Sequence, residues 1–431
     1  MASMTSNRFG AARLLISVAL LSALVLSVTA CTTPASTTQS PAPASAATGT
    51  ASAQTTPAAE LPPLPDSAYE LQTDLPSWVD TQTGFDVTRH WKMSGGTWPV
   101  VMLMSPSQSP QAIVGFQNGT FAKALKPFGI TPVLEKIDLP PRTFHALQRS
   151  KWPFVYMPLA VFTDYSRSQQ NQGGAGGLQY VALAGSTAGG GYTLLARDPA
   201  IKSVKDLAGK SVAQVNSNPV PATLLAAAAK QAGLGVGDGA GQVHYARGPD
   251  VSQLNDYMAG KYDAVISLNI LKGQLLAQGS HVVTDFAGVP YTPNYTILAV
   301  ERSVLEQKPE VVKAFLEAHY AANKVAEKTW DTGLKAELMK SWNDYFKGQK
   351  VPSAKQRIVA NQAAFDTLLG NMYPAQRIDP KFLADQWSMV AANNLWGWTG
   401  KVDTAKLSDL GLYDRILAAH GEEPQASASK K

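Results

Sequence analysis

Cysteine is nearly absent from this sequence. The chain of 431 residues contains a single one, Cys31, which excludes any disulfide within the chain. Six histidines are present, but they lie far apart along the sequence, and none forms a metal-ligand pair with a neighbouring His or Cys. We therefore expect no metal site.

Charge is also scarce and evenly spread. Asp, Glu, Lys and Arg make up 16% of the residues, and the formal net charge of +5 is scattered without a basic tract. A protein that binds nucleic acid usually concentrates its positive charge on one face or segment. The composition therefore gives no support to a nucleic-acid partner.

Motifs for catalysis and cofactor binding are missing as well. The glycines between Gly233 and Gly241 alternate without a G-x-G-x-x-G match, and they follow an expected helix where a dinucleotide fingerprint must open one. The sequence has no G-x-S-x-G elbow and no Walker A segment. We expect no cofactor and no catalytic residue, although a triad assembled only in space stays open because a linear motif does not reveal it.

The amino terminus carries the most specific signal. Arg8 and Arg13 precede the apolar run Leu14–Val28, the layout of a secretory signal peptide. This run is shorter than the roughly 20 residues of a membrane-spanning helix. It ends in Val-Thr-Ala before Cys31, which resembles the lipobox of bacterial lipoproteins and implies cleavage after residue 30 and lipidation of Cys31. The alternative is a stray cysteine at the end of an uncleaved anchor.

Both ends of the exported chain are expected to be disordered. Residues 31–66 comprise the lipidated cysteine and a stretch of Ala, Ser, Thr, Pro and Gln with few large apolar side chains. Such a composition cannot bury enough surface to offset the entropy of ordering. We interpret this stretch as a tether and residues 421–431 as a disordered tail.

Between these ends the sequence alternates strand and helix patterns. Strands are expected at Val100–Met104, Val133–Ile137, Phe154–Met157, Tyr180–Ala184, Tyr192–Arg197, Ser211–Val215, Gln242–Tyr245, Ala264–Ile266 and Tyr295–Val300. Helices are expected at Pro110–Leu125, Arg142–Gln148, Val204–Leu207, Val220–Gly233 and Val251–Gly260, and from Ser303 onward. This alternation predicts an α/β fold with parallel or mixed sheets flanked by helices and a helical carboxyl-terminal part.

Four blocks resemble solute-binding proteins of ABC-type importers. They are Ile201–Ala213, Leu224–Leu234, Met258–Ile266 and Thr296–Ala318, in the order found in that family. The aliphatic sulfonate, taurine and nitrate branch is the most similar, and it includes proteins similar to pyrimidine-precursor binders. The resemblance covers roughly Val100 to Trp330.

The resemblance implies a two-lobed periplasmic-binding-protein-like fold of type II. The first lobe would comprise residues 67–190, with an amino-terminal extension, and 291–420, and the second lobe residues 191–290. Two crossovers are expected near Ala188–Tyr192 and Val289–Tyr295, where a hinge closes on a small-molecule solute. The family further implies a monomer without cofactor, lipid-anchored on the outer face of the bacterial cytoplasmic membrane, with an ABC permease as partner.

Ligand contacts in such sheets are expected in loops beyond strand ends, where helix amino termini expose free N–H groups. Uncharged polar residues gather in these places, and Tyr291 and Tyr295 near the second crossover are suited to stack on a ring. The predicted ligand residues are Ser105, Ser107, Gln108, Ser109, Pro158, Leu159, Ser186, Thr187, Asn216, Ser217, Asn218, Asn269, Tyr291 and Tyr295. Pro158 and Leu159 are included because they match the loop that follows the fourth strand in the family that the chain resembles.

The solute is the least determined part of the sequence interpretation. The family favours a small organic anion such as a sulfonate, taurine or nitrate. However, Pro219 and Pro221 remove two N–H groups from a helix start that would face an anion. A neutral heterocycle, such as a pyrimidine or vitamin precursor, is the alternative. A lipoprotein enzyme on the same scaffold and a sensor or scaffold domain are the other classes left open.

Overall fold

The computed structural model describes residues 91–103, 109–137, 147, 151–171, 178–189, 191–214, 219–246, 250–289, 294–338, 372–392 and 406–423. The predictions for the signal peptide, Cys31 and the tether lie outside these ranges. So does the helix expected at Arg142–Gln148, except for Leu147. Of the tail predicted at 421–431, only residues 421–423 are described, and Glu422 accepts a hydrogen bond from the Tyr320 hydroxyl.

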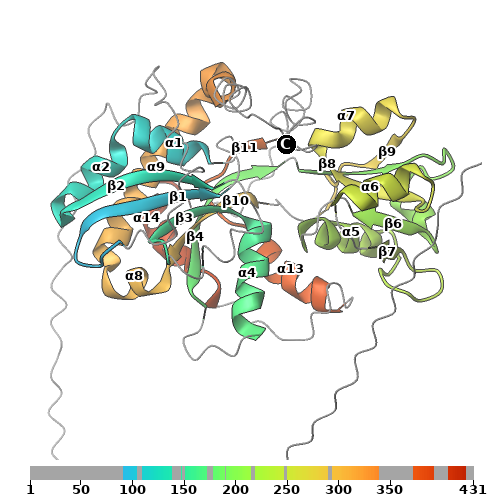
Figure 1. Cartoon of the computed structure of the whole chain (residues 1–431), viewed down its shortest axis with the longest axis horizontal. Coiled ribbons are helices and arrows are strands. Elements are labelled where there is room, and N and C mark those ends of the chain that lie inside the picture. The colour runs from blue at the N-terminus through green and yellow to red at the C-terminus, as the bar shows by residue number, and fades with distance from the viewer. Residues whose placement is uncertain are drawn as a thin grey trace, which may run out of the picture. The chain divides into compact units, whose positions relative to one another are not determined.

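The first sheet has six strands in the order β11-β4-β10-β3-β1-β2 (Figure 1). Its strands are β1 (Gly96–Leu103), β2 (Ile130–Ile137), β3 (Phe154–Pro158), β4 (Tyr180–Gly189), β10 (Asn294–Glu301) and β11 (Met372–Pro374). β1 pairs in parallel with β2 and β3, whereas β10 pairs antiparallel with β3 and β4. All five residues of β3 are buried, because helices cover both faces of the sheet.

One face of this sheet is covered by α1 (Pro110–Gln117), α2 (Thr120–Leu125), α9 (Pro309–Thr329) and α14 (Leu410–Ala419). Apolar residues recur along α9 at three- and four-residue spacing, so one stripe of the helix is buried. Its Phe315 ring stacks on Phe154 of β3 at 3.8 Å and on Phe121 of α2 at 4.4 Å. These rings form the centre of the first core cluster.

The second sheet has five strands in the order β7-β6-β8-β5-β9. Its strands are β5 (Tyr192–Ala196), β6 (Ser211–Gln214), β7 (His244–Ala246), β8 (Ala264–Leu268) and β9 (His281–Thr284). The helices packed with it are the short η5 (Val204–Leu207), α5 (Pro219–Gln231), α6 (Asp250–Met258) and α7 (Asn269–Ala277). β6 is parallel to β7 and β8, and β5 runs antiparallel to β8 and β9.

A second core cluster joins the other face of the first sheet to the second sheet. It contains residues of α4 (Leu159–Asn171) and α13 (Pro380–Ala392), which both pack against α5. Four consecutive alanines, Ala226 to Ala229, are buried in α5. Their small side chains let the neighbouring helices approach closely.

Both chain links between the sheets join equivalent edges. β4 is parallel to β3, so the carboxyl ends of β1, β3 and β4 share one edge with the start of antiparallel β10. In the second sheet, the carboxyl ends of β6, β8 and β9 share an edge with the start of β5. The first link runs from Gly189 to Tyr192, and the return link ends at Asn294. Each link therefore connects the carboxyl edge of one sheet to the carboxyl edge of the other.

Several details of the sequence prediction were wrong. The helix expected over Pro110–Leu125 is two helices, because Gly119 adopts a left-handed φ of 66° between α1 and α2. Helix α4 was not predicted, so Pro158 ends a strand and Leu159 begins a helix instead of forming a loop. Strand β4 extends to Gly189, which places Ser186 and Thr187 inside a strand.

Three further elements were missed, namely α7, β9 and β11. Strand β11 interrupts the carboxyl-terminal part that was expected to be helical, and it pairs with β4 from Thr187 to Gly189. Within the described part of the chain, no helix is both long and apolar enough to cross a membrane.

Candidate ligand-binding site

Three chain segments meet at the carboxyl edge of the first sheet. Thr296, near the start of β10, pairs with Pro158 at the end of β3 on one side and with Thr187 of β4 on the other. The Thr296 side chain is fully buried, and its Oγ1 has no hydrogen-bond partner among the described residues. A buried hydroxyl without a partner is uncommon and marks a place where a polar atom of a ligand or water fits.

The amino terminus of α1 lies at the same edge. Ser109 is its N-cap, and the Ser109 carbonyl accepts a hydrogen bond from the Ala112 amide at 3.1 Å. The Ser109 hydroxyl is fully buried, caps no backbone N–H and has no partner in the described ranges. Proline at position 110 supplies no N–H of its own, so the helix start offers fewer donors than usual.

Gln111 connects this helix start to the strand that enters the first link. Its Nε2 donates to the Ser186 carbonyl and to Asn323 Oδ1, both at 2.6 Å. Its Oε1 accepts a hydrogen bond from the Ser186 hydroxyl at 2.5 Å. Gln111, Ser186 and Asn323 are all fully buried. Their hydrogen bonds tie α1, β4 and α9 together in a region of low dielectric.

Another buried polar residue, His319, lies one helical turn before Asn323 on α9, and we call these buried hydrogen-bonded residues the polar layer. The fully buried His319 bonds through Nε2 to the Gly185 carbonyl at 3.0 Å and through Nδ1 to the Tyr156 hydroxyl at 2.8 Å. A carbonyl only accepts, so Nε2 carries the proton and Tyr156 donates to Nδ1. Burial lowers the pKa of His319 to about 3, against the opposing effect of its bond to Gly185. His319 is therefore neutral at physiological pH.

The structure describes part of the predicted ligand set. Ser109, Pro158, Leu159, Ser186 and Thr187 are buried and lie at the carboxyl edge of the first sheet. Asn269 begins α7 and Tyr295 lies in β10, but their side chains are not described. The remaining predicted residues, Ser105, Ser107, Gln108, Asn216, Ser217, Asn218 and Tyr291, lie outside the described residues.

The sequence interpretation missed the polar residues behind this edge. They are Gln111, Tyr156, Thr296, His319 and Asn323. A signal for two of them was present, since His319 and Asn323 occupy the apolar stripe of α9 where a polar residue needs a partner.

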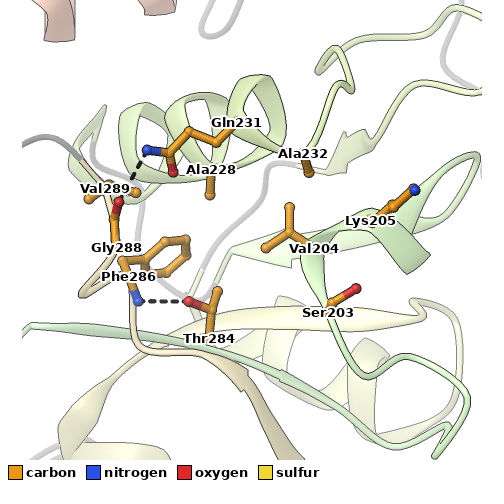
Figure 2. A pocket seen from close by; sticks show the side chains of 10 residues that line it. All are labelled: Ser203, Val204, Lys205, Ala228, Gln231, Ala232, Thr284, Phe286, Gly288 and Val289. Carbon is orange, nitrogen blue, oxygen red and sulfur yellow. Dashed lines mark hydrogen bonds between the residues drawn. The ribbon is translucent and has the colours of Figure 1, made fainter.

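A separate depression of about 300 Å³ lies beside the second sheet, between η5, α5 and the turn after β9 (Figure 2). Gln231 of α5 donates to the Gly288 carbonyl at 3.1 Å, and the Phe286 amide donates to Thr284 Oγ1 at 3.0 Å. Phe286 adopts a left-handed φ of 63°, a strained conformation that these bonds hold in place. The depression includes none of the predicted ligand residues, and we interpret it as the support of the turn that precedes the return link.

Metal ligands do not gather in the described part of the chain. No group of three or more His, Cys, Asp or Glu side chains within the described ranges comes close enough to hold a metal ion.

The chain was compared with family models, curated sequences and solved structures. The sequence model of the family described as NMT1/THI5 like matches residues 180–328. No curated protein sequence matches the chain.

Among solved structures, one similar chain is the periplasmic sulfonate-binding protein SsuA of a sulfonate ABC transporter from Methylobacillus flagellatus KT. The identity is 13% and the TM-score 0.53, over 77% of this chain and 96% of that one. The alkanesulfonate-binding protein SsuA from Xanthomonas axonopodis pv. citri, bound to MOPS, shows 13% identity and a TM-score of 0.49 over 73% and 98%. The nitrate-binding protein NrtA from Synechocystis PCC 6803 shows 12% identity and a TM-score of 0.49 over 75% and 89%.

The first of these structures confirms the fold that the sequence predicted. The described chain is an α/β protein of the periplasmic-binding-protein type, with two mixed sheets and flanking helices.

Proposed function

We propose that this protein is the extracytoplasmic solute-binding component of an ABC-type importer, and that it acts as a carrier and not as an enzyme. The observation that carries the proposal is the adjacency of the carboxyl edges of the two sheets, which the chain links twice. Uncharged polar residues lie at the described edge, and the fold is that of a periplasmic sulfonate-binding protein.

Capture would operate by closure of the two lobes. A ligand that contacts both edges only in the closed state binds that state more tightly, so it shifts the population toward closure. Gly189, with a φ of 83° in the left-handed region, ends β4 at the first link. A glycine there accepts the torsion changes that a hinge requires.

The solute class we propose is a small organic anion of the sulfonate type, held by hydroxyls and backbone N–H groups. A neutral heterocycle such as a pyrimidine is the second candidate, and a specific observation favours it. The residues that end β1, β3, β6 and β8, namely Leu103, Pro158, Gln214 and Leu268, carry no charge. Among the described residues, an anion at these four strand ends would therefore be held by uncharged donors.

The proposal is tested with a thermal-shift panel of ethanesulfonate, taurine, nitrate, bicarbonate and a hydroxymethylpyrimidine. We expect one class to raise the melting temperature of the protein, because a ligand that binds only the folded state stabilises it. Small-angle scattering should show a smaller radius of gyration with that ligand. The variant Thr296→Val keeps the shape of the side chain and should weaken the shift. Thr131→Val at the start of β2, at the opposite edge of the sheet, should not. A panel without any shift contradicts the carrier proposal, and a shift only with the pyrimidine contradicts the anion.

We further propose that residues 1–30 are removed, that Cys31 is lipidated, and that the monomer is held on the outer face of the cytoplasmic membrane beside its permease. Two or more acyl chains suffice for stable attachment. Replacement Cys31→Ser should therefore move the protein from the membrane fraction to the soluble fraction. Equal membrane association of the variant would contradict the anchor and leave the carrier proposal intact.

A further inference from the structure

The Gln111 side chain makes hydrogen bonds that fix its orientation completely. Its two N–H groups meet two oxygens that only accept, the Ser186 carbonyl and Asn323 Oδ1. Its Oε1 accepts a hydrogen bond from the Ser186 hydroxyl. A flipped amide would place Oε1 against the Ser186 carbonyl, which cannot donate, so that hydrogen bond would be lost. No other residue type of this length offers both an acceptor and two donors in one plane, so the position requires glutamine.

These bonds join the three elements nearest to the proposed ligand edge. Gln111 lies two residues after Ser109, whose buried hydroxyl has no partner in the described part of the chain. Ser186 lies three residues before Gly189, where β4 ends and the first link begins. Asn323 belongs to α9, the long helix that packs against α1 and α2. The start of α1 and the hinge end of β4 are thus held to one rigid helix.

From this geometry we propose that Gln111 is a positioning residue that couples the helix start at the ligand edge to the first link between the lobes. The inference rests on the proposed function and deepens it. If a ligand displaces Ser109 and the start of α1, Gln111 moves with them. Ser186 must then move too, since Gln111 is hydrogen-bonded to both the carbonyl and the hydroxyl of Ser186. Buried hydrogen bonds couple the movements of the groups they join. Breaking one costs free energy, because water cannot reach the buried polar groups to replace the lost partner.

Hydrogen exchange on the full-length apo protein tests this coupling without a ligand. We compare Gln111→Met, which keeps the side-chain length but removes the three bonds, with the wild type. The matched control is Gln253→Met, since Gln253 is a buried glutamine of α6 whose only described side-chain bond is a 3.4 Å contact to Tyr262. We expect Gln111→Met to speed amide exchange at 186–189 and 192–194 by about tenfold or more, since the loss of even one buried hydrogen bond has an effect of about this size. Gln253→Met should leave these amides unchanged.

Acceleration confined to 111–117, or equal at every amide of both sheets, overturns the proposal, because Gln111 would then support only its own helix or general stability. If Gln111→Met does not fold, Ser186→Ala serves instead. It removes the hydroxyl that donates to Gln111 Oε1 and keeps the backbone carbonyl that accepts from Gln111 Nε2.

A binding measurement on the same variants separates the two proposals. Calorimetry with ethanesulfonate, and with a hydroxymethylpyrimidine, should give a Kd about tenfold higher for Gln111→Met and an unchanged Kd for Gln253→Met. An unchanged Kd for Gln111→Met would refute the coupling although the carrier function stands. If the wild type binds neither compound, the solute assignment is wrong, and the exchange data still decide whether Gln111 couples α1 to the link.

Discussion

The buried His319 should make the stability of this protein depend on pH in a defined window. In the folded protein its pKa is about 3, whereas the ordinary value is 6.5. Between these values the unfolded chain binds a proton that the folded protein does not bind. The free energy of unfolding therefore rises with pH through this window. The stability that the neutral histidine contributes is lost progressively as the pH falls below about 6.5.

The magnitude follows from the two pKa values. Between pH 7 and pH 5 the linkage of this one group amounts to about 2 kcal/mol, and between pH 7 and pH 3 it amounts to about 4 kcal/mol. Other groups titrate in the same range, so a variant must isolate the contribution of His319. Replacement His319→Gln does so, because the amide can donate to the Gly185 carbonyl and accept from Tyr156 but does not titrate.

Urea unfolding of the wild type and His319→Gln at pH 7 and pH 5 measures the effect. We expect the wild type to lose about 2 kcal/mol more than the variant between the two pH values. The control variant is His244→Gln, since His244 is only half-buried in edge strand β7 and should behave as the wild type does. Equal losses for His319→Gln and the wild type would refute the neutral, buried histidine.

Two further substitutions test how the first sheet and its helices are held together, each by urea unfolding at neutral pH. A Cβ at Gly185 would lie 2.6 Å from the Arg377 carbonyl oxygen and 2.8 Å from that of Ala375, so we expect Gly185→Ala to cost about 1–3 kcal/mol or more. Gly288→Ala meets nothing within 4 Å, and equal stabilities for the two variants would contradict the clash. The Glu301 carboxylate caps α8 (Arg302–Gln307) by accepting from the amides of residues 303 and 304 at 2.8 and 3.2 Å, so Glu301→Gln should cost about 1 kcal/mol. The exposed Glu306→Gln on the same helix should cost nothing measurable, and an equal loss there would argue against the cap.

The alternation of strands and helices was predictable because it rests on local patterns. Apolar runs such as Phe154–Met157 and the periodic face of α9 appear in the structure close to their predicted bounds. Elements without such a pattern were missed. Strand β11 has three residues and is formed by its pairing with β4, and no local period records a pairing partner distant in the sequence.

Helix α4 was missed for a different reason. It follows β3 without a turn, and its residues from Thr163 onward are mostly polar, so the apolar period of its first turn is short. The loop expected at Pro158 and Leu159 came from the family resemblance, and no helical period in the sequence argued against it. The helix is specified by packing of Leu159 and Phe162 into the second core cluster, which only the folded chain reveals.

The polar layer behind the ligand edge was readable in part from the sequence. His319 and Asn323 stand one turn apart on a helical stripe that otherwise carries Val312, Phe315 and Leu316. A polar side chain at a buried position costs free energy unless it is hydrogen-bonded, so its presence in an apolar stripe predicts a partner. The identity of that partner was not predictable, because Gln111 lies 212 residues away and meets Asn323 only through the packing of α1 on α9. Sequence periodicity therefore indicates where a buried polar contact must exist, and the tertiary fold decides which residue makes it.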